Sequence, residues 1–117
     1  MRRFLLASML FVTLAIAANL TGNWSGEIQS EGDTHPLYLV LKQEGDTLTG
    51  SGGPNDSEQH PMQNGKIDGG KMSFDVPAGK GTFHFELATD GDVLKGTVQL
   101  KSEQEAHSGT VSLKRAG

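Results

Sequence analysis

Residues 41–50 (LKQEGDTLTG) and 87–96 (LATDGDVLKG) repeat one pattern, and this pattern decides the fold. Leu, an acidic residue, Gly, Asp, Leu and Gly recur at the same offsets in both copies. An acidic residue followed by Gly accepts the positive φ angles of a type I′ turn, whose twist matches that of the flanking strands. Each copy therefore predicts a β-hairpin, with its turn at Glu44-Gly45 in the first and at Asp90-Gly91 in the second.

The second hairpin also predicts which side chains face each other. With the turn placed there, Leu87 lies opposite Leu94. Phe85 then lies opposite Gly96 on the same face of the sheet. Glycine inside a strand lets a sheet bend sharply, and an aromatic side chain on the neighbouring strand covers the gap. The other glycines that fall on apolar faces of predicted strands are Gly26, Gly50, Gly52 and Gly109.

A third hairpin is predicted between the two repeats. A Gly-Gly turn at residues 69–70 places Ile67 opposite Met72. The pair next to the turn joins Asp68 to Lys71, so that opposite charges also meet.

The whole chain after residue 21 alternates apolar and polar residues with a period of two, which is typical of antiparallel strands with one wet face. Eight strands are predicted, at 22–29, 36–43, 47–52, 62–67, 71–76, 82–88, 93–100 and 108–114. An open meander of this kind would leave two unpaired edges, and pairing the first strand with the last removes them. We therefore expect an all-β fold, an up-and-down meander closed into a small barrel, with an open roll or a two-sheet sandwich as the alternative.

A meander alternates its connections between the two ends of the barrel. The three tight turns fall at one end, and four longer polar loops, 30–35, 53–60, 77–80 and 101–107, fall at the other. We call these the closed end and the mouth. Ligands bind preferentially in the mouths of β-barrels, so any small-molecule site is expected there.

The first 18 residues have the pattern of a signal peptide. Arg2 and Arg3 precede an apolar run at 4–16, and Ala15-Ile16-Ala17 provides small residues for cleavage after Ala17 or Ala18. The run is shorter than the ~20 residues that span a bilayer, which disfavours a membrane anchor. We expect a signal peptide at 1–18, a β-barrel domain at 19–117, no membrane span in the mature chain, and export to the periplasm or outside the cell.

Composition excludes several classes of function. The chain has no cysteine, so disulfides, thiolate catalysis and thiolate metal sites are excluded. Its formal net charge is −4, its basic residues are scattered, and its aromatic residues are few, which argues against a nucleic-acid partner. No catalytic motif or cofactor-binding motif is present, so we expect neither an enzyme nor a bound cofactor.

Three short motifs resemble those of lipocalins and related calycin barrels. Gly22-Asn23-Trp24 is similar to the G-x-W opening of that family, and Thr89-Asp90 is similar to the start of its second motif. The resemblance implies that Arg115, after the last strand, packs across Trp24 to close the barrel. Gly91 stands where the family has Tyr, and the chain is shorter and lacks a C-terminal helix. It looks most like small exported bacterial lipocalin-like domains; the opening LTGNW also resembles avidins, although biotin sites of that type need several tryptophans.

The candidate ligand-binding residues are the apolar side chains expected beneath the mouth: Leu37, Phe74, Val76, Phe83 and Leu100. An eight-stranded barrel is either filled by side chains or holds one small ligand, and the phenylalanines and long aliphatic residues here favour filling. A cavity would indicate a module that binds a small apolar or amphipathic molecule. A filled core would indicate a structural domain that binds another protein through its surface.

Histidines offer a third hypothesis, a metal-assisted hydrolase. His35, His60 and His107 all fall in predicted mouth loops, but they lack the spacing of a known metal motif, so no metal site is predicted. His84, on the polar face beside Glu86, is interpreted as solvated.

Overall fold

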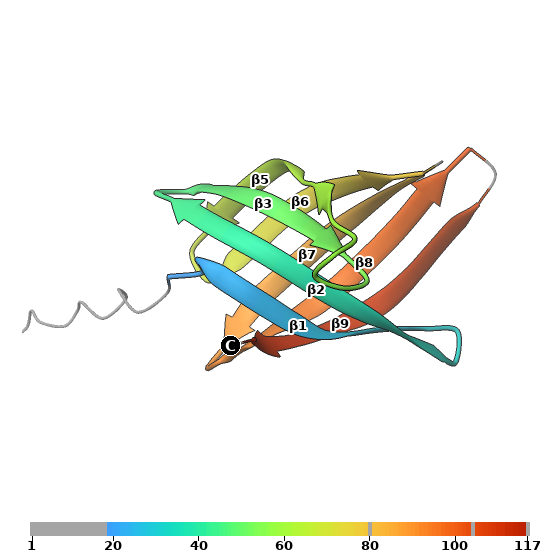
Figure 1. Ribbon diagram of the computed structural model, residues 1–117, viewed down its shortest axis with the longest axis horizontal. Coiled ribbons are helices and arrows are strands. Elements are labelled where there is room, and N and C mark those ends of the chain that lie inside the picture. Colours follow the sequence, from blue (N-terminus) through green and yellow to red (C-terminus); the bar gives the residue numbers. More distant parts are fainter. Residues whose placement is uncertain (1–18, 80, 104, 117) are drawn as a thin grey trace, which may run out of the picture.

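The computed structural model describes residues 19–79, 81–103 and 105–116, which form a closed eight-stranded antiparallel β-barrel (Figure 1). The strands are β1 (Gly22–Ser30), β2 (Asp33–Glu44), β3 (Thr47–Gly53), β4 (His60–Pro61), β5 (Gln63–Asp68), β6 (Lys71–Ala78), β7 (Gly81–Asp90), β8 (Val93–Ser102) and β9 (Ala106–Arg115). None of the described residues lies in a helix that is long and apolar enough to cross a membrane. The predicted signal peptide, residues 1–18, lies outside the described residues.

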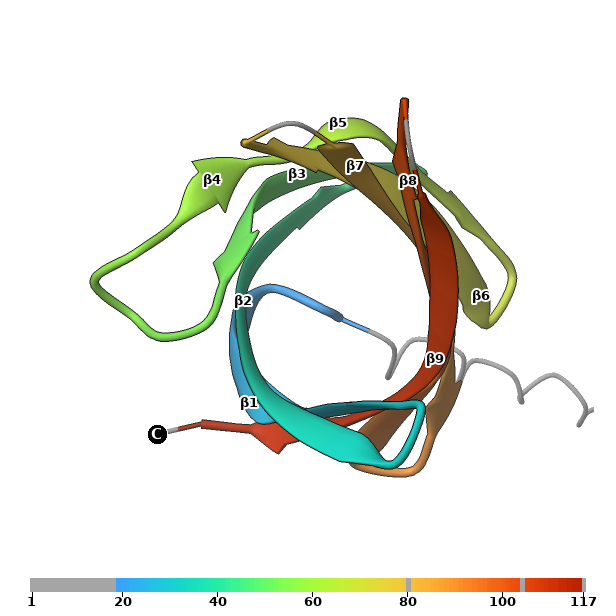
Figure 2. The same cartoon turned by 90° about the vertical axis from the view of Figure 1, so that its right-hand side faces the viewer.

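The ring closes as the alternating pattern predicted. The strands follow the order β2-β1-β9-β8-β7-β6-β5-β3-β4, and a further pairing of β2 with β3 completes the circle. The first strand pairs with the last, so that Gly26 faces Leu113 and Ile28 faces Val111. The all-β, up-and-down barrel is confirmed, and the open roll and the sandwich are wrong. The short strand β4, which pairs only with β3, stands away from the barrel wall (Figure 2).

The hairpin turns differ from the predicted ones by one residue. Glu44 pairs with Thr47, so the first turn is Gly45-Asp46, and the second is Gly91-Asp92. In each turn only the glycine has a positive φ, 63° at Gly45 and 65° at Gly91. A positive φ at the first central residue alone is the pattern of a type II′ turn, not of type I′. The acid before each glycine therefore ends a strand.

This difference moves the register of β7 and β8 by two residues. Leu87 faces Gly96, whereas Phe85 faces Val98, so the predicted Phe85–Gly96 pair is wrong. Because a shift of two keeps every side chain on its original face, the inward and outward assignments survive. The Gly-Gly turn at 69–70 is confirmed, with Ile67 opposite Met72.

The mouth carries fewer long loops than predicted. Ser30 pairs with Asp33 across a two-residue turn in which Glu31 and Gly32 both have positive φ. Ala78 pairs with Gly81, and Lys101 with Ala106, so these strands run on into the predicted loops. The predicted loops 30–35, 77–80 and 101–107 are therefore too long. Within the described residues, the one long connection at the mouth is the segment 54–59 between β3 and β4.

Candidate functional site

The inward side chains change in size from one end of the barrel to the other. At the closed end they are large, and the most deeply buried include Leu39, Leu41, Leu48, Leu94 and Leu113. Near the mouth several inward positions hold small residues: Ser30, Gly52, Ala78 and Gly109. Since all strands belong to one continuous sheet, this gradient leaves space only in the mouth half.

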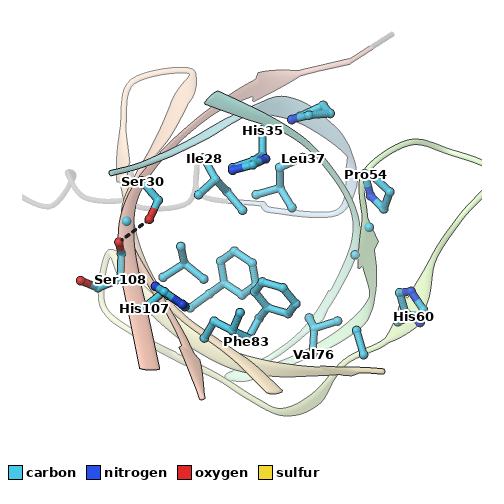
Figure 3. A pocket seen from close by; sticks show the side chains of 18 of the residues that line it. Ile28, Ser30, His35, Leu37, Pro54, His60, Val76, Phe83, His107 and Ser108 are labelled. Atoms are coloured by element: carbon cyan, nitrogen blue, oxygen red, sulfur yellow. Dashed lines mark hydrogen bonds between the residues drawn. The ribbon is translucent and has the colours of Figure 1, made fainter. Parts of the chain in front are cut away.

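That space is a cavity of about 540 Å³ (Figure 3). This volume lies within the ~300–1,000 Å³ range of small-molecule sites. The apolar wall of the cavity consists of Ile28, Leu37, Val76, Ala78, Phe83, Phe85, Val98 and Leu100. The polar residues among those that line it include Ser30, Glu31, Asp33, His35, Glu58, His60 and His107. An apolar interior with a polar rim is suited to an apolar or amphipathic molecule.

Four of the five predicted ligand-binding residues line this cavity: Leu37, Val76, Phe83 and Leu100. The fifth, Phe74, is buried in the core, where its ring stacks on that of Phe85 with centroids 4.9 Å apart. The expectation of a filled interior holds only for the half of the barrel below this stack. The mouth half is open, because small residues stand there at inward positions.

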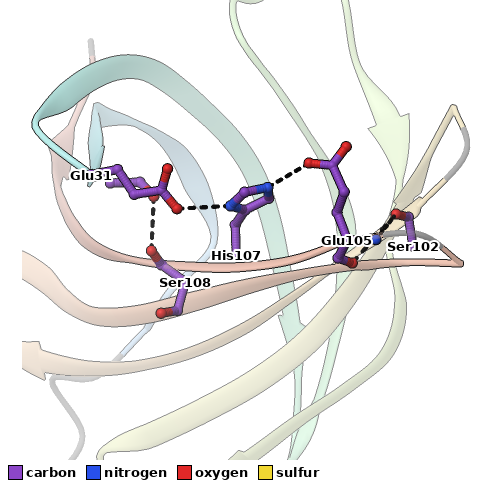
Figure 4. Close-up of polar contacts among 6 residues, drawn as sticks. Glu31, Ser102, Glu105, His107 and Ser108 are labelled. Atoms are coloured by element: carbon purple, nitrogen blue, oxygen red, sulfur yellow. Dashed lines mark hydrogen bonds and ion pairs between the residues drawn. The ribbon is translucent and has the colours of Figure 1, made fainter.

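One side of the mouth is held by a histidine between two carboxylates (Figure 4). His107 Nδ1 lies 2.8 Å from Glu31 Oε2, and His107 Nε2 lies 2.6 Å from Glu105 Oε1. The hydrogen bonds to Glu105 and Glu31 raise the pKa of His107, because a protonated imidazole donates to both. This clamp ties the β1–β2 turn to the start of β9, and Ser30 Oγ donates to the Ser108 carbonyl beside it at 2.8 Å.

The opposite side of the mouth is formed by the segment 54–59, which side-chain hydrogen bonds hold in place. Asn55 Oδ1 accepts from the backbone N–H groups of Ser57 and Glu58 at 2.9 and 2.8 Å. Gln59 Nε2 donates to the Tyr38 carbonyl at 3.1 Å, which fixes the segment to β2. Glu58 therefore reaches the rim from a segment with a defined conformation.

The three mouth histidines do not come together. His35, His60 and His107 all line the cavity, but they lie on different sides of it (Figure 3). No group of three or more His, Cys, Asp or Glu residues suited to a metal ion occurs among the described residues. The geometry required by the metal-assisted hydrolase hypothesis is thus not found.

A second clamped histidine, His84, lies on the outer face of the barrel. Its side chain is 35% exposed, so it is partly solvated as interpreted, but it is also held between two carboxylates. His84 Nδ1 lies 2.6 Å from Asp75 Oδ1 on the paired strand, and its Nε2 lies 3.1 Å from Glu86 Oε2. The hydrogen bonds to Asp75 and Glu86 raise the pKa of His84. Hydrogen bonds from Asn64 and His84 lower the pKa of Asp75. The sequence alone did not show the cross-strand partner, because the Asp75–His84 pair depends on the register of β6 and β7.

The closed end is sealed by Trp24 and the segment before β1. The guanidinium of Arg115 lies 4.5 Å from the centre of the Trp24 ring, and Trp24 Nε1 donates to the Leu20 carbonyl at 3.0 Å. Arg115 also donates to the carbonyls of Asn19 and Thr21. Leu20, which the sequence analysis did not place in the core, is buried across this end. The barrel is therefore blocked at one end and open at the other.

These features define the class of protein as a small closed antiparallel β-barrel, compatible with a calycin-like barrel, with a cavity at its mouth. Comparison of the chain with protein-family models, curated proteins and solved structures found no match. The architecture and the site consequently carry the functional argument.

Proposed function

We propose that this protein is an exported binding module that takes one small apolar or amphipathic molecule into the cavity at its mouth. The observation that carries the proposal is the cavity of about 540 Å³, with an apolar wall and a polar rim. Such a cavity leaves apolar surface in contact with water, and a ligand that covers this surface gains the free energy of its burial. Gly22-Asn23-Trp24 and Arg115 resemble the residues that close the barrel in lipocalins. This resemblance agrees with a binding function.

A structural or interaction domain is less well supported. That alternative predicts a filled core and an exposed apolar or edge-strand patch. Val40, with 37% of its surface exposed, is the one exposed large hydrophobic residue among those described. A single residue of this kind is normal on a soluble domain.

Filling the cavity tests the proposal. Leu100 lies at the upper part of the apolar wall, paired with Phe83 on one side and His107 on the other. Leu100→Trp places a large ring in the cavity, and Ala78→Leu places a smaller, branched aliphatic side chain there from β6. Both variants are expected to abolish the thermal stabilisation of the protein by a panel of apolar amphiphiles. Val40→Trp, which adds the same ring to the outer face, is expected to leave that stabilisation unchanged.

Two results would contradict the proposal. If no amphiphile stabilises the wild-type protein, or if the folded Ala78→Leu variant binds as tightly as wild type, the cavity is not the binding site. Circular dichroism of each variant establishes that it has kept the barrel.

Export has its own test. The proposal rests on the pattern of residues 1–18, with Arg2 and Arg3 before the apolar run. Intact mass measurement of the protein recovered from a bacterial host is expected to show a chain that begins after Ala17 or Ala18. A chain that keeps its first residues and stays in the cytoplasm would contradict this part of the proposal.

A further inference from the structure

Charge is distributed unevenly among the residues that line the cavity. Three acidic residues line it, Glu31, Asp33 and Glu58, and no lysine or arginine is among its described lining residues. The surface beneath them is apolar, with Phe83 and Leu100 in direct register on β7 and β8. A molecule that enters the cavity therefore passes from an acidic rim to an apolar interior.

The three acidic residues come from separate parts of the chain, and hydrogen bonds hold the side chain of Glu31 and the backbone of Glu58. Glu31 occupies a tight turn at positive φ and is held by His107 at 2.8 Å. Glu58 is held by the bond from its backbone N–H to Asn55 Oδ1 at 2.8 Å. Asp33 is the first residue of β2, paired with Ser30. The acidic rim is consequently a property of the folded mouth and not of one flexible loop.

Histidine does not cancel this charge. His107 neutralises at most one carboxylate when it is protonated, and Glu105, on its other side, adds a further carboxylate next to the rim. His35 and His60 also line the cavity, but among the described residues neither forms an ion pair with a rim carboxylate. The mouth thus keeps an excess of negative charge, in keeping with the formal net charge of −4 for the chain.

We propose that the ligand is an amphipathic cation, with an apolar body in the cavity and an amine or quaternary ammonium group at the rim carboxylates. This inference rests on the proposed binding function and specifies the chemistry of its ligand. The apolar body supplies affinity through burial against the wall. The carboxylates attract the cation and disfavour an anion of the same shape, which sets specificity and increases the association rate.

The inference is tested with three amphiphiles that share one alkyl chain and differ only in the head group. Calorimetric titration of the protein with decyltrimethylammonium, decanol and decanoate, each below its micelle concentration, separates the head group from the chain. We expect the cation to bind roughly tenfold more tightly than decanol, with decanoate weakest, and we expect added salt to reduce the difference.

Variants locate the effect. Asp33→Asn combined with Glu58→Gln removes two rim carboxylates without touching the His107 clamp, and it is expected to bring the affinity for the cation to roughly that for decanol. Glu27→Gln removes one carboxylate from the exposed outer face of β1 and is expected to change nothing. Unchanged affinity for decanol in all these variants would show that the cavity has been preserved.

The remaining outcomes distinguish failure of the inference about charge from failure of the proposed function. If decanol and decanoate bind as well as the cation, the binding function stands and the inference about charge is wrong. The same holds if the double variant keeps the full preference for the cation. If none of the three binds, the proposed function itself fails.

Discussion

The closed end and the mouth are built on the same eight strands and the same alternation, yet one is solid and the other hollow. At the closed end, Trp24 and a set of leucines fill the interior, and Leu20 covers them from outside the barrel. At the mouth, residues such as Ser30, Ala78 and Gly109 occupy the equivalent inward positions. The period of two determines which face is inside, whereas the size of the inward residues determines whether that inside is filled.

The two ends also use different interactions to hold their strands together. The closed end uses burial, a guanidinium over an indole ring, and hydrogen bonds to the carbonyls of Asn19 and Thr21. The mouth uses exposed polar contacts, mainly the clamp of His107 by Glu31 and Glu105. We therefore expect most of the stability to reside at the closed end, which leaves the mouth free to serve binding.

The largest expected effect comes from truncating one aromatic side chain at each end of the barrel. Trp24→Ala leaves a void in a packed core and is expected to cost about 3–5 kcal/mol of unfolding free energy. Phe83→Ala is expected to cost roughly 1–2 kcal/mol, because its ring already borders the cavity and its loss encloses no new void. Urea unfolding of both variants measures the difference, and equal costs would contradict the division of the barrel into a solid and a hollow half.

The next effect concerns how closely the backbones of neighbouring strands approach each other in the closed half of the barrel. A Cβ at Gly96 would lie 2.0 Å from the Glu86 carbonyl oxygen, on the neighbouring strand. Gly96→Ala is expected to cost about 1–3 kcal/mol, because the backbones of β7 and β8 must separate. Gly70→Ala is the matched control, since its Cβ would meet only the Thr89 hydroxyl oxygen at 3.4 Å. That control is expected to change the free energy by less than about 0.5 kcal/mol, and an equally tolerant Gly96 would show that the barrel does not need this close approach.

The closed end was easier to predict from sequence than the mouth, and the reason is physical. Alternation of large apolar residues identifies an interior directly. The one-residue error in the turn at Gly91-Asp92 moved the register by two residues, so every inward residue stayed inward. Closure of the ring followed from the cost of unpaired edges. The position of each turn did not follow. A type I′ turn needs a positive φ at both central residues and a type II′ turn at the first alone, and an acidic residue followed by Gly-Asp fits either one.

The mouth depends on contacts between residues far apart in the sequence, which a pattern of local periods does not contain. Glu31 meets His107 across 76 residues, and polar runs such as 30–35 look like loops whether or not the strands continue through them. The sequence favoured a filled core over a cavity. Composition gives the number of phenylalanines, but it does not show that Phe74 and Phe85 stack below the mouth. Inward glycine, alanine and serine near the ends of strands were the signal that could have indicated it.

A smaller effect is expected at the seam between the first and last strands. Arg115→Ala removes the contact with Trp24 and the donors to two carbonyls, and is expected to cost about 1–2 kcal/mol. Arg115→Lys keeps the charge but not the planar fork, so we expect it to recover about half of the loss. Lys114→Ala, one residue earlier on the exposed face, is expected to be neutral. Urea unfolding measures all three, and an Arg115→Ala variant as stable as Lys114→Ala would mean that the seam is held by strand pairing alone.

The smallest effect is the pH dependence of the two clamped histidines. Because the folded protein raises the pKa of His84, the clamp stabilises the fold fully below the unfolded pKa of this histidine and loses that contribution as the pH rises through the folded value. Because the pKa of Asp75 is lowered, the contribution of Asp75 is present above its unfolded pKa and is lost as the pH falls through the lowered value. The pair is therefore most effective between these two limits, and its exposure restricts it to about 0.2–1 kcal/mol.

The pH dependence of the His107 clamp has the same sign, but the clamp lies at the exposed rim of the mouth, so this dependence should appear in titration and not in global stability. Proton NMR is expected to show both imidazoles titrating above the ordinary histidine range, with Glu105→Gln lowering the pKa of His107 alone and Asp75→Asn lowering that of His84 alone. Unfolding measured from acidic to alkaline pH should lose the contribution of His84 in a His84→Gln variant and be unaffected by His107→Gln. A larger change in stability from His107→Gln than from His84→Gln would mean that the His107 clamp at the mouth contributes to global stability.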